Sequence, residues 1–178
     1  MADHPNVVGY QDAEWNEQSY GKKFGHRRKS LGSAAGGEKL GCSLYEVPPG
    51  RRAWPYHYHL ANEEAVYVLE GSGTLRIGGE EISISEGDYV ALPARAEAAH
   101  QIVNDSEVVL RYLCFSTLVE PDVMIYPDSG KVGIFGGLRQ EARRRRGTST
   151  RFSGAMPRSA ITKAKDSRSL ADWLLRLF

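Results

Sequence analysis

The sequence predicts an all-β protein whose strands form an antiparallel sandwich or barrel. Short apolar runs rich in Val, Ile, Tyr and Leu follow one another across residues 41–117, and turn signals separate them at close spacing. Helical spacing of apolar residues persists there for no more than one turn. Strands at this density, with no helices between them, are typical of antiparallel sandwiches and barrels. The length of 178 residues fits one domain with tails.

Three regions follow one another along the chain. Residues 1–40 lack clear periodicity, and their second half is basic and Gly-rich, so we expect an N-terminal extension of loops with a possible edge strand. Residues 41–137 carry the strand pattern and form the barrel. Residues 138–178 are polar, basic and aperiodic until the end, which predicts a flexible arm. The arm ends in SLADWLLRLF, where Leu170, Trp173, Leu174 and Leu177 repeat at the spacing of a short amphipathic helix.

Within the barrel region, each predicted strand ends at a turn signal. The runs are GCSLYEV, EAVYVLE, TLRI, EEISI, YVAL and EVVLRYLCFSTLV, and the last is the longest. Gly78 and Gly79 separate TLRI from EEISI, and because glycine accepts a positive φ, the pair predicts a tight hairpin. Residues 121–137 predict one further short strand and an ordered loop.

Composition narrows the class of protein. An apolar content of 41% allows a packed core without disulfides. Cys42 and Cys114 both lie in strand-like runs, and we expect buried thiols instead of a bridge. The sequence has no apolar run of membrane-spanning length, and its polar, acidic start does not resemble a secretory signal. We therefore expect a cytoplasmic protein without membrane contact.

The net charge of +1 conceals an acidic body and a basic end. Residues 45–128 hold 14 acidic and 5 basic residues, whereas residues 139–168 hold 10 basic and 2 acidic ones. The run of arginines at 143–146 lacks interleaved aromatic residues and a recognition helix. It predicts a solvated arm and not a nucleic-acid site.

Two short blocks carry the residues that point to chemistry. In the first block His57 and His59 stand two apart, which places both imidazoles on one face of a strand, and Glu64 follows after a bend. In the second block His100 arrives from a later strand. Three nitrogens and one oxygen suit divalent transition metals such as Fe, Mn, Zn, Ni, Co or Cu, and suit Mg or Ca poorly. The sequence therefore predicts a metal site formed by His57, His59, Glu64 and His100.

These blocks resemble the two signature motifs of the cupin superfamily. The first motif is matched by Gly50, His57, His59, Glu64 and Gly71, and the six-residue gap from Glu64 to Gly71 favours Glu64 over its neighbour Glu63 as the ligand. The second motif is matched by Gly87, Pro93, His100 and Asn104. Arg95 stands where the family usually has glycine, and the stretch between Pro93 and His100 is two residues longer than the minimal form. This longer form is similar to small single-domain bacterial cupins.

The resemblance implies a jelly-roll barrel, also called a double-stranded β-helix, of six to eight strands with the metal near its open mouth. It also implies a homodimer and a small-molecule substrate or ligand. The first activity it suggests is a sugar or sugar-phosphate isomerase in which the metal acts as a Lewis acid. A dioxygenase and a non-catalytic module that binds a metabolite or metal remain open alternatives, and no residue stands out as the general base.

Four basic residues are candidates for holding an anionic substrate group. Arg51, Arg52 and Arg95 flank the motifs, and Lys131 follows them in the chain. For the three arginines, a solvated position on the surface is an equally good interpretation. His26 lies in the basic segment HRRK, where we expect it to be exposed to solvent. Asn104 is predicted to form a turn before Asp105 and Ser106.

Overall fold

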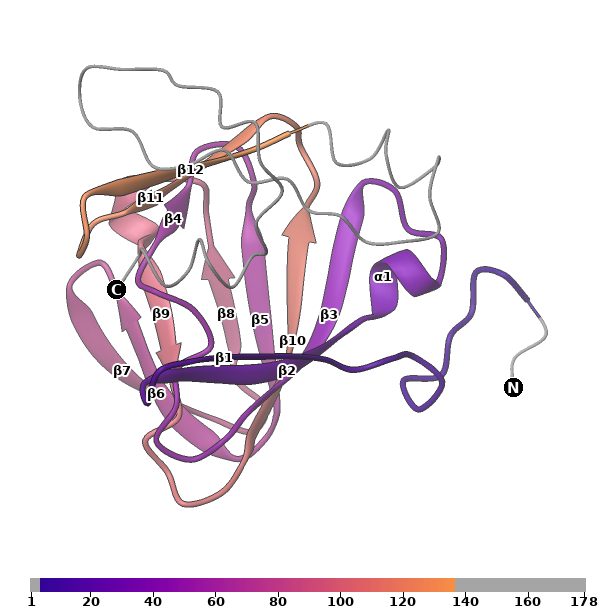
Figure 1. The fold of residues 1–178 in the computed structure, drawn as a ribbon, viewed down its shortest axis with the longest axis horizontal. Helices are drawn as coiled ribbons and strands as arrows, with labels where there is room; N and C mark the ends of the chain where they lie inside the picture. Colours follow the sequence, from indigo (N-terminus) through magenta and orange to yellow (C-terminus); the bar gives the residue numbers. More distant parts are fainter. Residues whose placement is uncertain (1–3, 137–178) are drawn as a thin grey trace.

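The computed structural model describes residues 4–136, which form three antiparallel sheets. Figure 1 shows the long strands of the largest sheet side by side, with the smaller sheets at its edge and across one end. The predicted all-β antiparallel fold is therefore confirmed, and its arrangement is that of a jelly roll. The basic arm and the C-terminal helix predicted for residues 138–178 lie outside the described residues.

The largest sheet has six strands and forms one wall of the barrel. Their order across the sheet is β1 (Asn16–Tyr20), β2 (Phe24–Ser30), β3 (Leu40–Val47), β10 (Leu110–Thr117), β5 (Glu64–Glu70) and β8 (Tyr89–Leu92). Strands β3 and β10 pair over eight residues each, from Leu40 opposite Thr117 to Val47 opposite Leu110. Because side chains alternate across a strand, this register fixes which residues face the interior.

The second sheet consists of β7 (Glu80–Ser85), β6 (Ser72–Ile77) and β9 (His100–Val103). The predicted hairpin between β6 and β7 is confirmed, with Gly78 and Gly79 at φ values of 57° and 90°. A side chain at either position would be strained, since positive φ favours glycine. A 3-10 turn, η1 (Ala96–Ala98), follows β8 and leads directly into β9.

The third sheet consists of β12 (Lys131–Phe135), β11 (Asp122–Tyr126) and β4 (Tyr58–His59). The sequence predicts a single strand after residue 121, whereas the structure forms a two-stranded hairpin. Gly133 in this second strand is packed against aromatic rings, since a Cβ there would lie 3.1 Å from the Phe135 ring and 3.5 Å from the Tyr126 ring. The hairpin brings β11 against β4, with Met124 opposite His59.

The predicted N-terminal extension contributes structure to the main sheet. Within it, β1 and β2 extend the sheet beyond β3, and α1 (Leu31–Ala34) connects β2 to β3. The outer face of β2 is covered by the preceding segment, where Lys29 Nζ donates to Tyr10 O at 2.7 Å and lies 4.6 Å from the Trp15 ring. Figure 1 shows this segment continuing away from the barrel towards the N-terminus.

The prediction that His26 is exposed to solvent is wrong. His26 lies on the inner face of β2 and is only 4% exposed. Its ring packs against Trp54 and Tyr45, with centroid distances of 4.9 and 5.2 Å. The pairing of β2 with β3 turns this side chain inward, and the local sequence HRRK contains no sign of that pairing.

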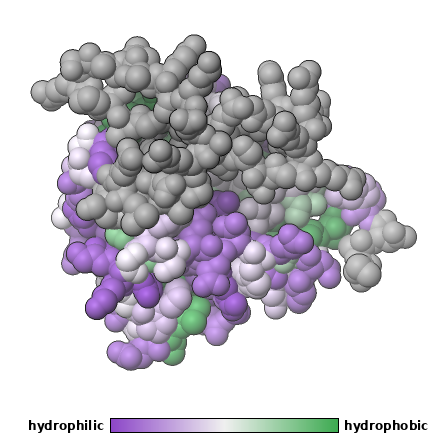
Figure 2. Space-filling view, in the orientation of Figure 1, coloured by the Kyte–Doolittle hydropathy of each residue, from purple (hydrophilic) through white to green (hydrophobic). Residues whose placement is uncertain are grey.

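The apolar core lies between the main sheet and the β6–β7–β9 sheet. Its members share exposures of 6% or less: Tyr45, Val47, Ala53, Val66, Val68, Leu75, Ile84, Leu92, Ile102, Leu110 and Tyr112. The face shown in Figure 2 is predominantly hydrophilic where it is coloured, with isolated hydrophobic side chains. Among the described residues, no helix has both the length and the apolar character needed to cross a membrane.

Candidate metal centre

His57 and His100 are held opposite each other by a backbone bridge. His57 N donates to His100 O at 3.0 Å, and His100 N donates to His57 O at 2.8 Å. Their rings lie 4.6 Å apart between centroids, and both residues are buried. The bridge joins the segment before β4 to the start of β9, so residues 43 positions apart in the sequence share one site.

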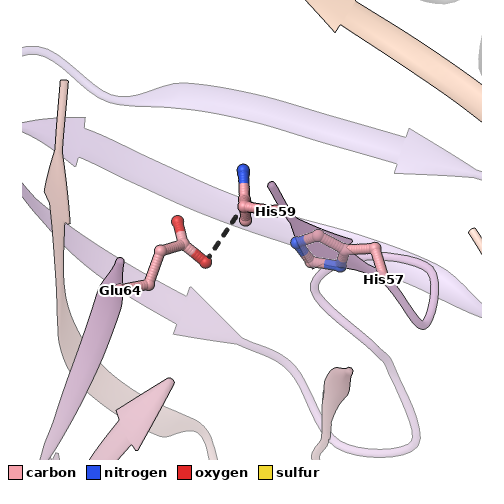
Figure 3. Close-up of side chains that lie close together, drawn as sticks. All are labelled: His57, His59 and Glu64. Carbon is pink, nitrogen blue, oxygen red and sulfur yellow. Dashed lines mark ion pairs between the residues drawn. The ribbon is translucent and has the colours of Figure 1, made fainter. Parts of the chain in front are cut away.

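His59 and Glu64 complete the cluster from two further strands. His59 lies on β4, and Glu64 is the first residue of β5. Glu64 Oε2 lies 3.5 Å from His59 Nε2 and 3.3 Å from His100 Nε2. In Figure 3 the Glu64 carboxylate points towards His59, with the His57 ring on the other side of His59. One ligand atom from each of His57, His59 and Glu64 lies within 4.8 Å of the others, as a shared metal ion requires.

Each of the three histidines has its Nδ1 atom engaged by a fixed acceptor. His57 Nδ1 lies 2.7 Å from Pro55 O, and His100 Nδ1 lies 3.0 Å from Ala98 O. Since a carbonyl oxygen can only accept, both Nδ1 atoms must carry the hydrogen. In a neutral imidazole the hydrogen on Nδ1 leaves a lone pair on Nε2, the form that binds a metal.

His59 is oriented by a carboxylate that the sequence analysis missed. Its Nδ1 lies 2.5 Å from Asp122 Oδ2, while Asp122 Oδ1 accepts the Ala61 N–H at 3.1 Å. Asp122 opens β11 and is 3% exposed. A carboxylate that orients a metal-binding histidine is a common supporting contact. No motif spacing leads to Asp122, because it lies 63 residues after His59 and reaches it only through the β11–β4 pairing.

The charges of the cluster follow from burial and these contacts. Burial and the neighbouring His100 lower the pKa of His57 to about 3, so its imidazole is neutral near pH 7. Burial alone would raise the pKa of Glu64, but hydrogen bonds from His100 and His59 hold it well below its usual range. Burial would also lower the pKa of His59, but Asp122 and Glu64 outweigh it and raise that pKa to about 9. Without a metal, His59 therefore carries the proton that balances these carboxylates.

The donor set fits a divalent transition metal. Neutral imidazole nitrogens and one ionised carboxylate are ligands that such ions prefer, and the ring orientations are supported by Pro55, Ala98 and Asp122. Glu63, the competing oxygen donor, is exposed, whereas Glu64 faces the histidines. The structure thus brings together the four residues that the motifs single out.

The four predicted anion-binding residues lie in three parts of the chain. Arg51 Nη1 donates to Gly21 O at 2.9 Å, and Arg52 bridges to Phe24 and Val103 through its backbone. Arg95 is exposed just before η1, and Lys131 opens β12. Within residues 4–136, none of the four forms a hydrogen bond or ion pair with the histidines or Glu64.

The contacts of Asn104 and of the two cysteines are those of residues that support the fold. Asn104 is fully buried, and its Oδ1 accepts the Ser106 N–H at 3.0 Å, as expected for a turn-forming residue. Its Nδ2 donates to Val47 O and to Val108 O. Cys42 and Cys114 are free thiols and partly buried. Cys114 Sγ lies 3.9 Å from Glu64 Oε1, at the edge of the histidine cluster.

Comparison with known proteins agrees with this architecture. The family model described as the cupin domain matches residues 43–116. An uncharacterized protein from Methanocaldococcus jannaschii is 34% identical over 70 residues, which is 39% of this chain and 54% of that protein. The chain thus matches about half the length of this curated relative.

Two crystal structures are similar to this chain over most of their lengths. The first is a protein from Acidithiobacillus ferrooxidans whose assignment as a sugar phosphate isomerase is itself inferred. It is 32% identical, with a TM-score of 0.68 over 74% of this chain and 87% of that one. The second, described as a sugar phosphate isomerase from the cupin superfamily of Silicibacter pomeroyi, is 24% identical with the same TM-score and coverage. With its paired motifs, its jelly-roll sheets and these relatives, the chain belongs to the cupin superfamily.

Proposed function

We propose that the protein binds one divalent transition metal on His57, His59, Glu64 and His100 and uses it to isomerise a sugar or sugar phosphate. The observation that carries the proposal is the convergence of the four side chains, with the three Nδ1 atoms held by Pro55, Asp122 and Ala98. Iron, manganese, zinc, nickel and cobalt all suit this donor set.

The choice of reaction has separate support. The protein from Acidithiobacillus ferrooxidans is 32% identical, and its own assignment as a sugar phosphate isomerase is inferred. A bound divalent ion would polarise the substrate's carbonyl oxygen as a Lewis acid.

The chain's own residues would position the substrate and exclude water. Tyr126 is 3% exposed, and its ring lies 5.9 Å from that of His57, so it closes one side of the cluster. Burial and the nearby carboxylates of Asp122 and Glu64 raise the pKa of Tyr126, which keeps its hydroxyl protonated at neutral pH. Asp122 and the backbone carbonyls would hold the imidazoles in place during the reaction.

Metal content is the first test. Full-length protein should contain close to one transition-metal ion per chain by elemental analysis, and the double variant His57→Ala, His59→Ala should lose it. His4→Ala serves as the matched control, since His4 is exposed and lies far from the motifs in the sequence. Wild-type protein that contains no metal after production in supplemented medium would overturn the proposal.

Activity is the second test, and it separates the three functions open to a cupin. An isomerase should exchange a substrate hydrogen with solvent deuterium during interconversion of aldose and ketose, which NMR detects. Metal-dependent oxygen uptake with catechols, diketones or thiols would instead assign a dioxygenase. Ligand-induced thermal stabilisation without turnover of any of these compounds would assign a binding module. Either of the last two results would refute the isomerase.

A further inference from the structure

A positively charged side chain on the inner face of the main sheet has no counter-ion among the residues that the structure describes. Arg28 lies on β2 opposite Tyr45 of β3, a core residue that is 6% exposed. Its Nη1 donates to Tyr45 Oη at 3.4 Å, and its Nε is buried without a hydrogen-bond partner. Within residues 4–136, Arg28 forms no ion pair with a carboxylate. A partly buried guanidinium with an unused donor is costly unless something else supplies an acceptor.

Two other arginines of the main sheet do have carboxylate partners. Arg27, the neighbour of Arg28 on the outer face of β2, pairs with Glu46. Arg111 pairs with Glu46 and Glu70, at 2.7 and 2.9 Å. The sheet therefore provides carboxylates for arginines on its outer face and none for Arg28 on its inner face.

Tyr45 offers a second unused donor beside Arg28. Its hydroxyl oxygen accepts hydrogen bonds from Trp54 Nε1 at 3.2 Å and from Arg28 Nη1. A hydroxyl oxygen accepts two bonds and donates one, so both lone pairs are occupied. Among the described residues, no acceptor takes the hydroxyl hydrogen. The Arg28 Nε–H and the Tyr45 O–H thus form a pair of neighbouring donors.

The titratable side chains around Arg28 are neutral near pH 7 and do not balance its charge. Burial and Arg28 itself lower the pKa of His26 to about 4. Burial raises the pKa of Tyr45. Among residues 4–136, Arg28 is therefore not paired with an opposite charge on the inner face of β2 and β3.

This charge lies on the same inner face as the metal centre. Cys114 links the two regions: its Sγ lies 3.9 Å from Glu64 Oε1, and its strand β10 pairs with β3, the strand that carries Tyr45. In the sheet, Cys114 is paired with Ser43, which is two residues from Tyr45 and so faces the same side. Two small side chains, Ser43 and Cys114, thus lie between Tyr45 and Glu64 on this face.

We propose that Arg28 and Tyr45 bind the phosphate group of the substrate while its carbonyl end lies at the metal centre. The assignment rests on the proposed isomerase function and makes its substrate a sugar phosphate in preference to a free sugar. Guanidinium and hydroxyl donors are suited to phosphate oxygens, and the ligand would supply the charge that the fold lacks. Arg28 would replace Arg51, Arg52, Arg95 and Lys131 as the anion-binding residue.

Binding of inorganic phosphate to the full-length protein tests the site without requiring turnover. Calorimetry should show that phosphate binds Arg28→Gln at least about tenfold more weakly than wild type. Lys22→Gln removes an exposed positive charge from the β1–β2 turn and should bind phosphate as wild type does. Phosphate bound directly to the metal would contribute equally to all three proteins, so the difference isolates Arg28. Equal affinities in wild type and Arg28→Gln would overturn the proposal. Acetate in place of phosphate shows whether the site takes carboxylates instead, and tighter acetate binding would also overturn it.

Stability distinguishes a ligand-binding arginine from a structural one. Without phosphate, Arg28→Met should unfold at the same temperature as wild type or higher, because it removes an unpaired charge. A melting temperature several degrees below wild type would identify Arg28 as a structural residue and contradict the proposal.

Kinetics separate the failure of this inference from failure of the isomerase. With a phosphorylated aldose, Arg28→Gln should raise KM at least about tenfold, while kcat/KM for the free aldose stays within about twofold of wild type. An enzyme inactive on both sugars, with Arg28-dependent phosphate binding, would refute the isomerase and leave the anion site in place. An active isomerase whose KM for the phosphorylated aldose is unchanged in Arg28→Gln would refute the anion site alone.

Discussion

Replacing Asp122 by Asn should weaken metal binding although Asp122 is not itself a predicted ligand. In wild type, Asp122 Oδ2 accepts the hydrogen of His59 Nδ1 and Oδ1 accepts the Ala61 N–H. Asparagine keeps the shape but has one acceptor oxygen, so it cannot serve both donors. If the Asn oxygen keeps the Ala61 N–H, the amide N–H₂ faces His59 Nδ1 and favours the tautomer with hydrogen on Nε2. That hydrogen occupies the position the metal needs.

The expected loss can be estimated from the contact. Removing a carboxylate that orients a metal-binding histidine lowers affinity by about 10- to 100-fold, or about 1.4 to 2.7 kcal/mol. The same hydrogen bond helps to raise the pKa of His59 to about 9, so a proton competes with the metal more strongly in wild type at low pH. At pH 8.5 this competition lowers the metal affinity of wild type by less than about tenfold. The affinities of wild type and Asp122→Asn are therefore best compared at that pH.

The dissociation constant can be measured at pH 8.5 by competition with a chelating indicator. Asp128→Asn is the matched control, because Asp128 lies in the same β11–β12 hairpin but pairs with Arg76 at the surface. It should bind metal with wild-type affinity. An Asp122→Asn variant that also binds metal as tightly as wild type would refute the role assigned to Asp122.

Two further predictions concern stability. The pKa of His26 is about 4 in the folded protein and about 6.5 when unfolded, so the unfolded chain binds a proton first as the pH falls. The free energy of unfolding should therefore decrease by up to about 3 kcal/mol between pH 6.5 and pH 4. In urea titrations, His26→Gln should lack this part of the pH dependence. Identical pH profiles for the two proteins would contradict the burial argument. Asn104→Ala should lower the free energy of unfolding by about 2–4 kcal/mol, because Asn104 Nδ2 donates to Val47 O and Val108 O, both at 2.7 Å. A loss under about 1 kcal/mol in the same assay would show that these carbonyls find other partners.

Local patterns in the sequence were sufficient to predict much of the barrel. Strand runs need only alternation and turn residues, and the hairpin at Gly78 and Gly79 needs only two glycines that accept positive φ. The second strand of the β11–β12 hairpin was missed, because KVGIF contains a glycine that weakens a strand on its own and is compensated here by packing against aromatic rings.

Part of the candidate site could also be predicted from local sequence, and part could not. His57 and His59 share a face because they are two apart, and the motif spacing brings Glu64 and His100 into consideration from the sequence alone. Asp122, Arg28 and His26 have no such signal, because strand pairing between distant segments decides which way their side chains face. The four basic residues predicted to hold an anionic group stay a prediction.

The sequence by itself determined the fold class and four candidate ligands, because strand alternation and motif spacing act over a few residues. Tertiary structure alone decided which acceptor orients His59 and that Arg28 faces the interior without a carboxylate partner among the described residues. Those two outcomes depend on the pairing of β11 with β4 and of β2 with β3. Pairing sets the register, and the register turns each side chain to one face or the other.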